Sequence, residues 1–136
     1  MKIGPNTPCP CGSGAKLKRC CRPLHQGAAA ASPEALMRAR FTAYAIGAID
    51  FILSTTHPGG PHFEADEGAW RASVRSFCAS TEFQRLEVLE ASESGGLGEV
   101  AFRVTLAQGG EDASFGERST FRKEGARWLY HSGELL

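Results

Sequence analysis

Four of the five cysteines in this chain of 136 residues lie close together near its N-terminus. They follow the spacing C-x-C-x8-C-C and are Cys9, Cys11, Cys20 and Cys21. The segment around them, up to about Leu24, is poor in apolar side chains and rich in proline and glycine, so it cannot fold by burying a hydrophobic core. Four thiolates are the ligand set of a closed tetrahedral zinc site, in which each sulfur lies about 2.3 Å from the metal. The spacing therefore predicts one structural Zn²⁺ that holds this segment together.

Other uses of these cysteines fit the sequence less well. Two disulfides would need either a ring between adjacent cysteines or cross-pairing in an oxidising compartment. Redox chemistry at the vicinal pair Cys20–Cys21 is a second alternative. His25, four residues past Cys21, is an alternative fourth zinc ligand.

The same segment is the basic end of a chain with no net charge. Residues 1–31 contain five basic residues and no acidic one, whereas the rest of the chain contains ten basic and fifteen acidic residues. The asymmetry predicts an interaction role for the basic end, with a protein or the ribosome as the partner. Residues 1–31 contain no aromatic side chain on which a base would stack, so we expect no sequence-specific reading of nucleic acid. The five basic residues are Lys2, Lys16, Lys18, Arg19 and Arg22.

From Ser32 onward the pattern predicts helices. Ser32 is a good N-cap, Pro33 suits the first helical position, and apolar residues then recur at helical spacing. Gly47 is expected to interrupt this helix, and a second short helix must stop before Pro58. A third helix is expected after an N-cap at Asp66. Its apolar face contains Trp70, Val74, Phe77 and Cys78.

After Thr81 the apolar residues alternate with polar ones, which is typical of strands. Four strands are expected, marked by Leu86 to Val88, Val100 to Leu106, Phe115 to Phe121, and Trp128 to Tyr130. Glycine-containing turns separate them, so each strand should pair antiparallel with the next. Helices followed by a strand meander predict an α+β fold with the helices on one face of the sheet.

The cysteine segment resembles the SEC-C motif, a zinc-binding segment found in the SecA translocation ATPase and in many small proteins. The resemblance rests on Cys9-Pro-Cys11-Gly-Ser-Gly followed by Cys20-Cys21, and it assigns these four cysteines as zinc ligands. In SecA the segment contacts the SecB chaperone and the ribosome. Leu17 stands where the motif usually has an aromatic residue.

The remainder resembles the YchJ-like family of small bacterial proteins. The resemblance rests on Leu36 to Tyr44, on Asp50-Phe51, on Thr55 to Pro58, and on Phe121 with Trp128 to Tyr130. It implies a nuclear transport factor 2-like (NTF2-like) cone, in which helices pack on a curved antiparallel sheet. The expected organisation is a SEC-C zinc segment over 1–25, a linker over 26–32 and an NTF2-like domain over 33–136. Removal of zinc should then unfold residues 1–25 and leave the cone intact.

Cones of this kind also house isomerases and lyases, so an enzyme or a small-molecule binder using the cavity is the alternative function. The candidate residues are Arg40, Tyr44, Asp50 and His57. Arg40 and Tyr44 share a helix face, but the sequence shows no set of nucleophile, base and orienting residue. We therefore favour a structural role, in which Arg40 pairs with Asp50 to fasten two helices, and we lean against an enzyme.

Three further expectations concern the rest of the chain. His57, His62, Glu64 and Asp66 form a weak candidate for a second metal cluster, and Cys78 is expected to be a packed core thiol. A homodimer through the outer sheet face is a further candidate assembly. No signal peptide or membrane span is evident in the sequence, so a cytoplasmic location is the default expectation.

Overall fold

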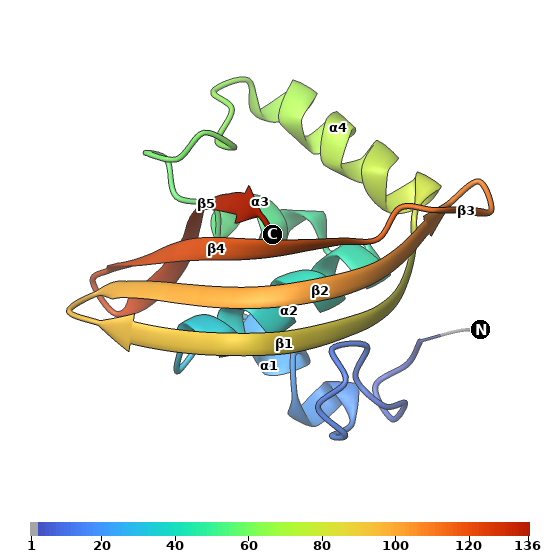
Figure 1. Ribbon diagram of the computed structural model, residues 1–136, viewed down its shortest axis with the longest axis horizontal. Helices are drawn as coiled ribbons and strands as arrows, with labels where there is room; N and C mark the ends of the chain where they lie inside the picture. Colours follow the sequence, from blue (N-terminus) through green and yellow to red (C-terminus); the bar gives the residue numbers. More distant parts are fainter. Residues whose placement is uncertain (1–2) are drawn as a thin grey trace.

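The computed structural model describes residues 3–136, so Lys2 of the basic segment lies outside the described residues. A curved antiparallel sheet forms one layer, with α2 behind it, α4 above it in the view of Figure 1 and the N-terminal segment below, beyond β1. Helices and curved sheet together form the expected α+β cone. Within residues 3–136 no helix is both long and apolar enough to cross a membrane.

The three helices that follow Ser32 lie where the sequence predicts them. α2 (Pro33–Ile46) starts at Ser32, whose hydroxyl accepts a hydrogen bond from the Ala35 N–H at 3.1 Å. It ends at Gly47, which has a left-handed φ of 77° that side chains other than glycine rarely adopt. α3 (Ile49–Ser54) is short, and α4 (Glu67–Ser80) is capped by Asp66, which accepts from Ala69 N–H.

The Ser32 cap stabilises α2, the helix that carries Arg40. Ser32→Ala is therefore expected to lower the free energy of unfolding by about 1 kcal/mol. Chemical denaturation measures the change. Ser54→Ala is the matched control, since the exposed Ser54 hydroxyl lies at the end of α3 and donates only to Phe51 O within its own helix. An equal loss for both variants would contradict a specific cap.

The sheet contains the four expected strands and one short extra strand. Sequential neighbours β1 (Glu82–Ser94), β2 (Leu97–Gln108), β4 (Phe115–Glu124) and β5 (Arg127–Leu135) pair antiparallel, and β3 (Glu111–Asp112) pairs only with the end of β2. The β1–β2 turn uses Gly95 and Gly96, both at positive φ, as a tight hairpin requires. β1 is longer than its two apolar markers indicate, because its last residues, 89–94, are exposed and mostly polar.

The residues after α3 also join the sheet. Tyr130 N–H of β5 donates to Thr55 O at 2.8 Å, and His57 N–H donates to Tyr130 O at 2.8 Å. This short parallel pairing fixes the end of α3 against β5. It therefore brings the threonines that follow α3 next to Tyr130.

The outer sheet face is charged. Arg118 of β4 pairs with Glu90 of β1 at 3.0 Å and with Glu99 of β2 at 3.6 Å, across three strands. Dimerisation through this face stays a prediction.

The core is shared between the N-terminal segment and the cone. Cys9, Cys11, Leu17 and Cys21 are buried in the same cluster as residues of α2 and of the sheet, among them Phe121 and Trp128. Leu17 is 6% exposed, so it fills the motif's apolar position as a core residue. A second cluster joins α3 and α4 through Ile52, Leu53, Trp70 and Val74, with Cys78 half-buried beside it.

Candidate functional site

The four clustered cysteines converge on one point. Their sulfur atoms all lie within 4.8 Å of one another, and no other group of three or more His, Cys, Asp or Glu side chains in residues 3–136 converges in this way. Cys11 Sγ lies 3.5 Å from Cys20 Sγ, which lies 3.9 Å from Cys21 Sγ. Neither distance is a disulfide, and all described cysteines are free thiols.

This geometry fits a four-coordinate metal. Four sulfurs about 2.3 Å from a tetrahedral centre lie about 3.8 Å from one another, close to the two distances observed. Thiolate sulfur is the donor that selects zinc and other soft metal centres. The four cysteines could therefore bind a metal ion, and zinc fits their donors and spacing.

Tight turns bring the cysteine pairs together. The backbone bridge between Pro8 and Lys16 closes the loop that carries Cys9 and Cys11, and Cys9 N–H donates to Ala15 O at 2.8 Å. The turn glycine Gly12 has φ 82°, which a side chain would strain. The short helices η1 (Leu17–Arg19) and α1 (Arg22–His25) then flank the second pair.

Ionisation of all four neighbouring thiols is unfavourable without a cation, because their negative charges would repel one another. Hydrogen bonds from the thiols of Cys11 and Cys21 lower the pKa of Cys9, whereas these shared hydrogen bonds raise the pKa of Cys21, first through Cys11 and then through Cys9. Burial raises the pKa of Cys20. A divalent cation at the centre would stabilise four thiolates together, so the electrostatics favour a metal ligand set over a reactive vicinal pair.

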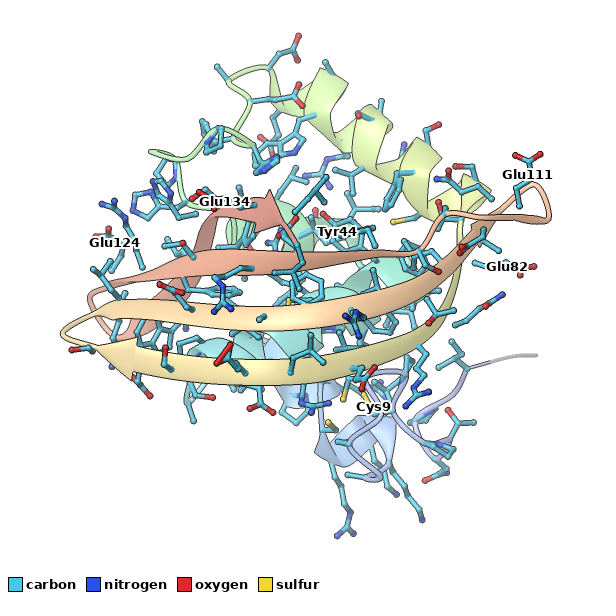
Figure 2. The ribbon with its side chains drawn as sticks, in the orientation of Figure 1. Cys9, Tyr44, Glu82, Glu111, Glu124 and Glu134 are labelled. Carbon is cyan, nitrogen blue, oxygen red and sulfur yellow. The ribbon has the colours of Figure 1, made fainter. Side chains whose placement is uncertain are left out.

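The N-terminal segment that carries the four cysteines packs against α2. Cys9 Sγ lies 3.5 Å from Thr42 Oγ1, and Arg38 donates to Cys11 O at 2.8 Å. In Figure 2 the labelled Cys9 lies where the N-terminal segment meets the sheet and α2. His25 points elsewhere, because its Nε2 lies 2.8 Å from Ala39 O and its ring packs on Phe51. It is therefore not in place to substitute for Cys21.

The second metal cluster expected in the loop before α4 does not assemble. His57 Nε2 lies 2.6 Å from Glu124 Oε1, whereas the His62 ring packs against Tyr130. Asp66 is used as the α4 cap. The loop places these side chains apart, and the sequence spacing alone could not show this.

A cavity of about 440 Å³ lies between the helices and the concave face of the sheet. Most of its walls are aromatic and aliphatic side chains, and Tyr44 is labelled in Figure 2 in the space between the sheet and α4. Tyr44 packs on Phe83 and Phe77, with ring centroids 6.0 and 5.7 Å away. Phe77 is 37% exposed, because it forms a wall of the cavity rather than part of the close-packed core.

Arg40 is the charged residue buried in this cavity, at 6% exposure. Its Nη1 donates to Ile52 O at 3.1 Å, to Thr55 Oγ1 at 2.8 Å and to Thr56 Oγ1 at 3.2 Å. Its guanidinium carbon lies 4.7 Å from the centroid of the Tyr130 ring. Arg40 thus fastens α2 to the C-terminal end of α3, whose carbonyls carry partial negative charge.

The expected pairing of Arg40 with Asp50 is wrong. Asp50 lies on the exposed side of α3 and accepts from Arg71 of α4, with its side chain 89% exposed. The order of charges in the sequence could not decide which side of this six-residue helix faces α2. Of the four cavity candidates, Arg40 and Tyr44 line the cavity, whereas Asp50 and His57 do not.

The sequence analysis did not select Glu117 or Ser119, two polar residues that line the cavity. Glu117 of β4 accepts hydrogen bonds from Ser119 Oγ at 2.5 Å and from the Tyr130 hydroxyl at 3.2 Å. Burial, followed by the nearby Glu117 charge, raises the pKa of Tyr130 above its usual range, so the phenol stays a donor. The alternation that places Phe115, Ser119 and Phe121 on one face also places Glu117 there, so an acid at an inward position was the available signal.

Known proteins match both parts of the chain. Residues 32–133 match the family model for the YchJ middle NTF2-like domain, and residues 6–23 match the SEC-C motif. A protein of family UPF0225 from Corynebacterium efficiens is 39% identical over 131 residues, covering 93% of this chain and 92% of its own length.

Two solved structures have the same fold. A SEC-C motif containing protein from Rhodopseudomonas palustris is 38% identical, with a TM-score of 0.80 over 96% of this chain and 99% of its own. A SEC-C motif containing protein from Psychrobacter arcticus has the same TM-score at 21% identity, covering 96% of this chain and 84% of its own.

Proposed function

The chain belongs to the YchJ-like family and carries a SEC-C motif, and we propose that its N-terminal segment is a zinc-bound contact surface for an acidic partner, a protein or the ribosome. The observation that carries the proposal is a set of unpaired basic side chains on a segment that packs against α2. The four described ones are all exposed and are Lys16, Lys18, Arg19 and Arg22.

None of these four cations takes part in an ion pair with a described residue. Residues 3–31 contain no acidic side chain that could neutralise them. Long nitrogen-tipped side chains extend from the N-terminal segment away from the sheet in Figure 2. A zinc ion with four thiolates carries a charge of about −2, so the segment keeps a positive surface when the metal is bound.

Metal binding and docking would hold this surface in one orientation. The contacts of Cys9 with Thr42 and of Arg38 with Cys11 O join the segment to α2. A preorganised surface loses less conformational entropy on binding than a flexible basic tail does. The cone would then act as the platform for an adaptor.

Capture from native lysate at roughly 50 and 200 mM salt tests the proposal. Changing Lys16, Lys18, Arg19 and Arg22 to Gln should lower the captured partner at least about tenfold at low salt, since charge contacts carry the affinity. Wild-type capture should itself fall at the higher salt.

The matched control removes four cations from the cone. Arg75, Arg85, Arg103 and Arg122 are exposed and have no ion pair among the described residues. Their change to Gln alters the net charge equally and should leave capture unchanged. An equal loss of captured partner in the two variants, or capture that does not change with salt concentration, would contradict a specific basic surface.

A further inference from the structure

We propose that the cone cavity binds a small apolar molecule with a single carboxylate, held by the free edge of the Arg40 guanidinium beside Tyr130. This site is separate from the basic N-terminal surface and does not depend on it. The proposal rests on the unused donors of Arg40, the chemistry of the cavity walls and the position of Glu117.

Arg40 uses only part of its donor capacity on the protein. Its three hydrogen bonds all leave from Nη1, and they go to Ile52 O and to the hydroxyls of Thr55 and Thr56. Nε and Nη2 make no hydrogen bond with residues 3–136. Every fully enclosed side-chain nitrogen or oxygen of these residues has a hydrogen-bond partner, so Nε and Nη2 are not fully enclosed. Since Arg40 is 94% buried and lines the cavity, these two nitrogens open into it.

The free nitrogens have the geometry that a carboxylate needs. The Nε and Nη2 edge of a guanidinium presents two parallel N–H groups, which bind both oxygens of a carboxylate. A hydroxyl or an amide oxygen would use only one of them. The unused edge therefore selects an anion with two oxygens.

Arg40 also has no direct ion pair among the described residues. No Asp or Glu oxygen of the described residues lies within 4.0 Å of its guanidinium. The Tyr130 ring and the end of α3 supply only partial negative charge. A buried cation without a counter-ion is unfavourable, so a bound anion would gain from a charge that the fold already buries.

Glu117 limits the ligand to one negative charge. Its carboxylate sits in the same cavity, and Gly133 leaves room for it, because a Cβ there would lie 2.4 Å from the carboxyl carbon. A second acidic group on the ligand would meet this carboxylate and be repelled. The ligand's carboxylate is thus directed to the Arg40 side of Tyr130.

Most of the remaining walls fit an apolar body. They include Met37, Phe41, Trp70, Phe83, Val104 and Leu106, from α2, α4 and the sheet. A volume of about 440 Å³ falls within the range of small-molecule sites, which combine apolar walls with a few polar groups. An aromatic or aliphatic monocarboxylic acid meets all of these constraints.

Titration of the wild-type protein with 4-phenylbutyrate, 4-phenylbutyramide and 4-phenylbutylamine tests the proposal. NMR should follow the Arg40 Nε–H directly, together with the fluorescence of Trp70. We expect the acid to bind at least about tenfold more tightly than the amide, because hydrogen bonds to charged groups are the stronger ones. The amine should bind most weakly, and the Arg40 Nε–H should shift only with the acid.

Arg40→Gln should abolish the preference for the acid, whereas Arg75→Gln on the exposed face of α4 should keep it. If Arg40→Gln does not fold, the proposal is still tested by the ratio of the affinities of the wild-type protein for the acid and the amide, and by the shift of the Arg40 Nε–H signal. Equal binding of acid and amide, an unmoved Arg40 signal, or no binding of the acid at about 10 mM would each overturn the proposal.

Discussion

Replacement of Cys11 by serine is expected to destabilise the whole chain and not only its N-terminal segment. The Cys11 side chain is fully buried, and its sulfur belongs both to the metal cluster and to the core shared with α2 and the sheet. Structural zinc sites supply much of the folding free energy of the segments they hold, so we expect a loss of roughly 3 to 5 kcal/mol. The cone should remain folded at room temperature, because Val100, Phe121 and Trp128 pack within it.

Urea denaturation and metal analysis together measure this effect. Wild-type protein should contain one zinc per chain, and Cys11→Ser should lose it along with the stability. Cys78→Ser is the matched control, since this half-buried thiol lies on α4 outside the metal cluster, and it should keep the zinc and lose at most about 1 kcal/mol. Full zinc content in Cys11→Ser, or equal losses in both variants, would exclude the assigned ligand set.

A chelator tests the expected independence of the two parts. The sequence predicts that metal removal unfolds residues 1–25 alone. Because the segment shares its core with α2, we also expect the face of α2 around Thr42 and Arg38 to become exposed to water. Amide signals from this face should therefore move together with those of the segment, and the midpoint of thermal unfolding should fall.

Local rules explain why much of this fold could be predicted. Ser32 and Asp66 cap helices through contacts three residues away, and Gly47 ends one by its own backbone preference. The strands follow from alternation and from glycine turns between neighbours in sequence. The cysteine cluster was readable for the same reason, because all its members lie in one short segment.

Long-range contacts explain what the sequence could not provide. Cys9 meets Thr42, 33 residues away, only because the segment packs on α2. Tyr130 contacts both Arg40 and Glu117 because the sheet curves and β5 pairs with Thr55. Nothing in local spacing reports such packing, so the docked metal segment and the polar end of the cavity appear only in the structure.

Replacement of Arg40 by alanine is expected to lower the free energy of unfolding by about 2 to 4 kcal/mol. The change removes three charged hydrogen bonds to the end of α3 and leaves a void beside the Tyr130 ring. The threonine hydroxyls keep their own bonds, from Thr55 to Phe51 O and from Thr56 to Ile52 O, which limits the loss. Urea denaturation with circular dichroism gives the value.

A double-mutant cycle with Asp50→Ala separates this network from the ion pair that the sequence suggested. Asp50 contacts Arg71 and is exposed, so Asp50→Ala should change stability by at most about 0.5 kcal/mol. The coupling between Arg40 and Asp50 should also be within about 0.5 kcal/mol, as for residues that share no partner. A coupling above about 1 kcal/mol would indicate that Arg40 and Asp50 interact directly. Additive changes would instead exclude the pair with Asp50, as expected when Arg40 is held by Ile52 O and the hydroxyls of Thr55 and Thr56.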